Sequence, residues 1–157
     1  MHPSRRPAGC GGRSPERQRR HQHDQSVFHT LLRRHHELDR QVEDLPNGIR
    51  AVTTASAPDL VALLHDHAEQ MHRRLQEGFG LRHWDPAFAE IFAQKDKVRM
   101  TLARTENGVI AEETSDDPNV VKLIRAHGAV VTGFVRDGGR AAAQPSPLPP
   151  DYVRVLG

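Results

Sequence analysis

The chain contains an internal repeat. Residues 22–78 align with residues 82–138 at a constant offset of 60 positions and without a gap. A chain of this kind is constrained to use one folding unit twice, and the simplest arrangement relates the two units by a pseudo-twofold axis. The identical aligned pairs are His23/His83, Phe28/Phe88, Asn47/Asn107, Gly48/Gly108, Ala51/Ala111, Thr54/Thr114, Pro58/Pro118, Val61/Val121, Leu63/Leu123, His67/His127 and Gly78/Gly138.

Each repeat opens with a segment of helical spacing, because its apolar residues recur every three or four positions. In the second repeat this segment follows Asp85-Pro86, a favourable helix start. The positions concerned are Phe28, Leu31, Leu32, His35 and Leu38 in the first repeat, and Phe88, Ile91 and Phe92 in the second.

The middle of each repeat predicts a β-hairpin. Asn47-Gly48 and Asn107-Gly108 each separate two short segments, and both residue types tolerate a positive φ in a tight turn. Apolar and polar residues alternate before the second Asn-Gly pair, which is typical of a half-buried strand. Residues 38–45 alternate less regularly and predict a weaker strand that stays partly helical.

A second helix is predicted to close each repeat. Ser56 and Asp116 are favourable N-cap residues, and a proline follows each of them two positions later. Gly78 and Gly138 are the matching C-cap glycines. The sequence therefore predicts an α+β fold in which two tandem αββα repeats form a four-stranded antiparallel sheet packed with helices.

The 157 residues are expected to form one domain with two tails. Residues 1–24 are rich in Arg, Gly, Pro and Ser and are expected to be disordered. Residues 25–138 form the single α+β domain, and residues 139–157 form a loose Pro/Ala-rich tail. The lone Cys10 excludes an internal disulfide, and no apolar run approaches the ~20 residues of a membrane span.

Charge is concentrated at the N-terminus. Six of the 22 Lys and Arg residues lie in residues 1–24, against two of the 20 Asp and Glu residues, so the remainder of the chain is slightly acidic. Nucleic-acid binding is therefore not expected of the folded part. A cytoplasmic location is the default expectation, and export stays open if the true N-terminus lies elsewhere.

Histidine is the unusual component, with 11 in the chain. His67 and His127 occupy the same aligned position on the apolar side of the second helices, and each precedes a small residue that lets helices approach closely. Met71 lies one turn after His67, and His35 lies on the apolar face of the first helix. Imidazole and thioether groups ligate copper and haem iron. We therefore expect a non-enzymatic metal- or haem-binding protein that uses His67 and His127, with Met71 and His35 as additional ligands.

Other interpretations stay open. A histidine beside an apolar stripe is commonly a packed residue with a hydrogen bond to a carbonyl or carboxylate, in which case the chain is a ligand-free interaction module that forms a homodimer. A third alternative is an enzyme with a histidine general base. His65 and His72 form a second cluster on the same helix, where metal capture would be adventitious, and the pair Asp116-Asp117 suits helix capping better than acid–base chemistry.

The motifs together resemble a family of small bacterial proteins with no assigned activity. The resemblance rests on Phe28-His-x-Leu-Leu…His35, the Asn-Gly turns, Asp85-Pro86-x-Phe88 and Glu113-Thr-Ser-Asp-Asp-Pro118…His127. It covers about residues 24–138, which implies one self-contained module, and it contributes no function.

Overall fold

A computed structural model describes residues 14–78, 82 and 84–156 of the chain. Its elements follow the order αββα twice, as predicted, with a 3₁₀ turn (η) before each hairpin and a short helix after the second unit. They are α1 (Pro15–Arg33), η1 (His35–Glu37), β1 (Leu38–Leu45), β2 (Gly48–Ala55), α2 (Pro58–Glu77), α3 (Pro86–Ala93), η2 (Lys95–Lys97), β3 (Arg99–Thr105), β4 (Gly108–Thr114), α4 (Pro118–Asp137) and α5 (Gly139–Ala142).

The four strands form one antiparallel sheet in the order β1-β2-β4-β3, so the two hairpins meet through β2 and β4. The register at this junction is symmetric. Ala51 pairs with its own aligned residue Ala111, and Gly48 pairs with Thr114 as Gly108 pairs with Thr54. The two hairpins are thus related by a pseudo-twofold axis that passes near the Ala51–Ala111 pair.

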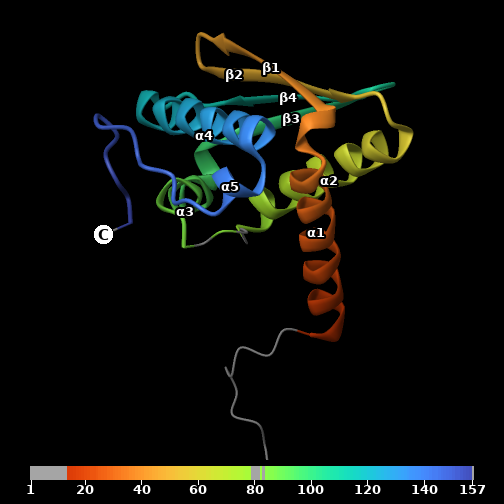
Figure 1. The fold of residues 1–157 in the computed structure, drawn as a ribbon. Helices are drawn as coiled ribbons and strands as arrows, with labels where there is room; N and C mark the ends of the chain where they lie inside the picture. The colour runs from red at the N-terminus through yellow and green to blue at the C-terminus, as the bar shows by residue number, and fades with distance from the viewer. Residues whose placement is uncertain (1–13, 79–81, 83, 157) are drawn as a thin grey trace, which may run out of the picture.

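The long helices α2 and α4 cover one face of the sheet. Each contacts mainly the strands of the other unit, because α2 lies on β4 and β3 while α4 lies on β2 and β1. The shorter α1 and α3 pack against α2 and α4 respectively. In Figure 1 the sheet runs along the top of the molecule, with α1, α2 and α3 below it. Because the helices cross over, neither unit can bury its apolar surface without the other.

Two glycines permit the close approach of β2 and β4. A Cβ atom on Gly48 would collide with the backbone oxygen of Glu113, and one on Gly108 would collide with that of Thr53. The Asn-Gly pairs therefore mark the hairpins correctly, but for a different reason from the one predicted. The loops are Pro46-Asn47 and Glu106-Asn107, and none of these residues or the two glycines has a positive φ. The glycines are needed for the contact across the sheet rather than for turn geometry.

The ends of α2 and α4, the second helix of each unit, agree with the predicted boundaries to within a residue. Gly78 ends α2 in the left-handed region with a φ of 69°, and Gly138 ends α4 with a φ of 65°. The N-caps are Ala57 and Asp117, one position later than predicted, and the Asp117 carboxylate accepts a hydrogen bond from a backbone N–H. Asp116 instead pairs with Arg99 at the surface.

The first helix begins earlier and ends sooner than predicted. Residues 15–24, which were expected to be disordered, are helical, whereas residues 1–13 lie outside the described part of the chain. Buried ion pairing explains the difference, because Asp24 accepts from Arg74 of α2 at 2.6 Å and both side chains are almost fully buried. The helix then ends at Arg33, so that His35 lies in η1 and residues 38–45 are free to pair as a full strand.

The segment after α5 is packed rather than loose. Tyr152 is buried in the main apolar cluster, and its hydroxyl accepts from the Gln94 amide. The buried carboxylate of Asp85 accepts the N–H and hydroxyl of Ser146, and Glu90 accepts backbone N–H groups of residues 155 and 156. Buried carboxylates need such donors. The C-terminal segment supplies them, and this explains why a Pro-rich sequence follows a defined path over α3.

Substitution of the junction glycines is expected to destabilise the fold. Gly48→Ala and Gly108→Ala each force the central backbones apart, and overpacking of this kind costs about 1–3 kcal/mol. Chemical denaturation measures the loss. Gly133→Ala in α4 is the matched control, because nothing lies within 4 Å of its Cβ position and alanine is the better helix residue. Parent-like stability of both junction variants would contradict the proposed packing constraint.

A cavity between the two helices

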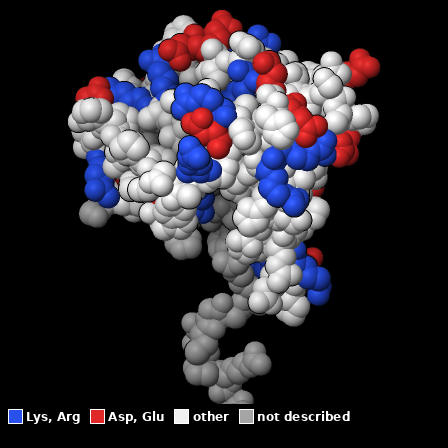
Figure 2. All heavy atoms as spheres, viewed as in Figure 1, with Lys and Arg blue, Asp and Glu red and all other residues white. Residues whose placement is uncertain are grey.

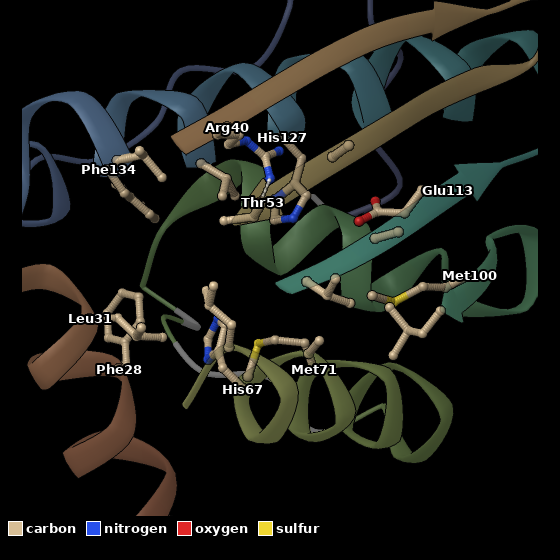
Figure 3. A pocket seen from close by; sticks show the side chains of 18 of the residues that line it. Phe28, Leu31, Arg40, Thr53, His67, Met71, Met100, Glu113, His127 and Phe134 are labelled. Carbon is tan, nitrogen blue, oxygen red and sulfur yellow. Dashed lines mark hydrogen bonds between the residues drawn. The ribbon is translucent and has the colours of Figure 1, made fainter. Parts of the chain in front are cut away.

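The sheet face and the four longer helices enclose a cavity of about 200 Å³. Its walls are mostly apolar and come from both units, and it is partly open to solvent. Figure 3 shows the labelled side chains around this space, with Phe28 and Leu31 of α1 on one side and Met100 of β3 on the other. The apolar stripes of α2 and α4 are therefore used to line an internal space.

His67 and His127 line this cavity from α2 and α4. Figure 3 shows them on opposite sides of the space. The Nδ1 atom of each ring is buried without a hydrogen-bond partner, and no other hydrogen bond to either ring occurs within the described residues. The more accessible Nε2 atoms are the ones that a molecule in the cavity could reach. The two predicted histidines thus line one cavity from opposite sides.

Aligned phenylalanines hold the two rings in place. Phe28 stacks on His67 with ring centroids 5.8 Å apart, and Phe88 contacts His127 edge-on at 4.6 Å. Phe28 aligns with Phe88 as His67 aligns with His127, so the same two positions make this ring contact in each unit. Phe134 joins the two pairs, because its ring lies 6.1 Å from Phe28 and 6.2 Å from Phe88. The rings form a continuous aromatic wall, so the orientation of each imidazole is set by packing rather than by a hydrogen bond.

The small residue after His127 lets α4 lie close to the sheet. At Gly128 a Cβ atom would collide with the side chain of Ile49 on β2, and Ala68 occupies the same position on α2. This close approach directs the preceding histidine toward the cavity. The small residues were predicted to let two helices approach closely, but Gly128 instead contacts the sheet.

Burial keeps both imidazoles neutral. Desolvation lowers the pKa of His67 to about 4 and lowers the pKa of His127 as well. The nearby carboxylates Asp24 and Glu113 oppose this effect, but they do not outweigh it. A neutral imidazole has one free lone pair, which is the form that binds a metal ion or accepts a hydrogen bond.

The other two predicted ligands also line the cavity. Met71 follows His67 by one turn, as the spacing predicts. The Nδ1 atom of His35 lies 2.7 Å from the carbonyl oxygen of Val135. Because a carbonyl can only accept, the Nδ1–H of His35 donates this hydrogen bond. Within the described residues, however, no three His, Cys, Asp or Glu side chains converge closely enough to hold an ion.

The second histidine cluster has a structural member. His65 Nε2 lies 2.7 Å from the carbonyl oxygen of Gly108 and 3.1 Å from that of Thr105, at the end of the other unit's hairpin. The aligned residue Arg125 donates in the same way to the carbonyl oxygen of Leu45. These contacts tie each helix to the opposite hairpin, so His65 does not belong to a metal-capturing surface.

Sequence reasoning missed the charged groups of the cavity. Arg40 of β1 and Glu113 of β4 both point inward, and Figure 3 shows them on either side of His127. The signal that could have located Arg40 is strand alternation with Leu38, but residues 38–45 were predicted to be only a weak strand. Glu113 lies two positions after Ala111 and therefore on the same face of β4.

No protein-family model matches the chain, and no curated protein or solved structure matches it either. Inference about function therefore rests on the cavity and its residues. On the face shown in Figure 2, basic and acidic side chains are interspersed rather than segregated. None of the helices within the described residues is long and apolar enough to span a membrane.

The lowered histidine pKa values predict how stability depends on pH. Below its ordinary pKa of 6.5, His67 is protonated in the unfolded chain but stays neutral in the folded chain down to about pH 4. The unfolded state therefore binds more protons, and the free energy of unfolding falls as pH drops through this window. Urea denaturation between pH 7 and about pH 4.5 should show a shallower decline in His67→Leu than in the parent. His36→Gln, at an exposed position, is the control and should retain the parental slope. An unchanged slope in His67→Leu would contradict the burial of a neutral imidazole.

Proposed function

We propose that this protein is a non-enzymatic binding protein that holds its ligand in the central cavity, between His67 and His127. One observation carries the proposal: two neutral imidazoles from aligned positions line a single apolar cavity and make no hydrogen bond to the described protein. Protein interiors rarely leave polar groups unused. A pair of such groups around one empty space is the arrangement expected of a ligand-binding site.

The ligand class best suited to neutral imidazoles is a transition-metal centre, and haem suits this cavity better than a bare copper ion. A bare ion requires several converging protein donors, whereas a porphyrin supplies four nitrogens itself and needs one or two axial ligands from the protein. The apolar and aromatic walls also favour a porphyrin over a hydrated ion. His67 and His127 are the proposed axial ligands, and Met71 and His35 are additional donors along the same cavity.

Haem binding requires the cavity to widen. A volume of about 200 Å³ is below the ~300–1,000 Å³ typical of sites for drug-sized ligands. Met71 and Met100 both line the cavity, and methionine side chains adapt readily because they are unbranched and flexible. Rearrangement of these side chains, together with separation of α2 from α4, is the change expected on binding.

A second candidate function follows from the same volume. An engineered apolar cavity of about 150 Å³ binds benzene in another protein. The present cavity, at about 200 Å³, therefore suits a single-ring apolar molecule without rearrangement. In this case the histidines would serve as hydrogen-bonding groups rather than as metal ligands.

General-base catalysis is a weaker alternative for these histidines. An efficient base has a pKa close to the working pH, because it must be both unprotonated and basic enough to accept a proton. Burial lowers the pKa of His67 and His127 away from neutrality. A weakly basic imidazole can still coordinate a metal, so the same observation favours binding over catalysis.

Titration of the purified protein with hemin tests the proposal. The parent should bind one hemin per chain with a shifted Soret band, and His67→Ala or His127→Ala should abolish the shift or weaken binding strongly. His36→Ala is the matched control, since it removes an exposed histidine. Copper titration and metal analysis of untagged protein distinguish a bare ion from haem.

The proposal is wrong if both cavity variants bind hemin and copper as the parent does, or if the parent binds neither. A folded, ligand-free dimer in that experiment would instead support the interaction-module alternative. The open edges β1 and β3 would then be the surfaces to examine, because the apolar faces of α2 and α4 already line the cavity.

A further inference from the structure

Arg40 is a partly buried cation of the cavity wall that makes no hydrogen bond or ion pair to a carboxylate within the described residues. Its Nε donates to the Thr132 hydroxyl at 3.1 Å, which is an ordinary hydrogen bond. Its terminal nitrogens lie 3.4 Å from the Thr53 hydroxyl and 3.3 Å from the Gly128 carbonyl oxygen. Both distances exceed the usual range for N–H···O bonds. The two terminal nitrogens of the guanidinium therefore make only long hydrogen bonds to the protein.

All three partners of Arg40 are neutral, and within the described residues it forms no ion pair with a carboxylate. Burial lowers the pKa of Arg40, and the negative charge of Glu113 across the cavity opposes this effect only in part. A cation that is largely removed from water and has no directly bonded carboxylate is stabilised when a ligand supplies one. The other cavity-lining arginine differs in this respect, because Arg82 pairs with Asp85 at 2.7 Å.

The position of Arg40 breaks the symmetry of the cavity. Its aligned residue in the second unit is Met100, which lines the equivalent part of the wall. One end of the cavity, next to His127, therefore has the guanidinium and the Thr53 hydroxyl (Figure 3). The opposite end, next to His67, has Phe28 and Met71.

We infer that the ligand is an apolar molecule that carries a carboxylate, and that Arg40 binds this carboxylate at the His127 end of the cavity. The inference rests on the proposed binding function and adds the ligand's charge and orientation. The forked guanidinium presents two N–H groups that match the two oxygens of a carboxylate. Haem, through its propionates, and a free aromatic acid share this chemistry, so the test must separate the two sources.

Substitution of Glu113 distinguishes an anionic ligand from a cationic one. It lines the same cavity near His127 and makes no ion pair with Arg40. A carboxylate bound at Arg40 would be repelled by Glu113, so Glu113→Gln should keep or increase its affinity. A cationic ligand would require the opposite result.

Two pairs of probes of matched shape test the inference on the full chain. Hemin and its dimethyl ester differ in the propionate charges, and 4-ethylbenzoate and 4-ethylbenzamide differ in one carboxylate. Absorption titration serves the first pair and calorimetry serves the second. The parent should bind at least one acid about tenfold or more tightly than its neutral analogue, as expected for a charged hydrogen-bonded pair.

Three variants locate the effect. Arg40→Met should remove the preference for the acid and leave the affinity of the neutral analogue unchanged, while Glu113→Gln should retain the preference. Arg40→Lys keeps the charge but loses the forked geometry, and it covers the case in which Arg40→Met fails to fold. The comparison of acid with neutral analogue in the parent requires no variant at all.

The outcomes separate this inference from the proposed function. If hemin and its ester bind equally and through the histidines, haem binding stands and the carboxylate inference is overturned. If neither porphyrin binds but 4-ethylbenzoate binds in an Arg40-dependent way, the haem proposal fails and the carboxylate inference stands. If no probe binds, or if Arg40→Met keeps the preference, the inference is overturned.

Discussion

The close contact between β2 and β4 is the constraint on which the rest of this structure depends. Gly48 and Gly108 leave no side chain between the two central backbones, so the hairpins can pair with Ala51 opposite Ala111. This pairing converts two separate hairpins into one sheet. It also fixes where β2 and β4 end, so α2 and α4 begin at symmetric positions. Each of these helices then packs mainly over the strands of the other unit.

The cavity is a consequence of that crossed arrangement. Gly128 lets α4 lie close to Ile49 of the sheet, and the bulky aromatic side chains of α1, α3 and α4 form one wall. The space left in the centre is bounded by the histidines of both units. Its shape follows the symmetry of the repeat, whereas its charge does not, because Arg40 is aligned with Met100. A symmetric scaffold therefore surrounds a cavity of asymmetric charge.

Much of the fold and part of the site could be predicted because repetition and periodicity are local properties. Short stretches of sequence encode the αββα order, the hairpin positions and the C-cap glycines. His67 and His127 were identified by their shared position in the repeat. Errors occurred where distant residues supply the stabilisation. Residues 15–24 are helical because Arg74 pairs with Asp24, and the C-terminal segment is ordered because Asp85 and Glu90 need donors.

The sequence by itself determined that one unit is used twice and that two histidines occupy equivalent places on apolar helix faces. Only the tertiary structure decided that these faces line a cavity, that His65 and His35 make structural hydrogen bonds, and that Arg40 faces the cavity without an ion pair to a described carboxylate. The physical reason is that burial and charge pairing depend on which strand lies under which helix. That arrangement is set by contacts between residues up to a hundred positions apart, such as His35 with Val135.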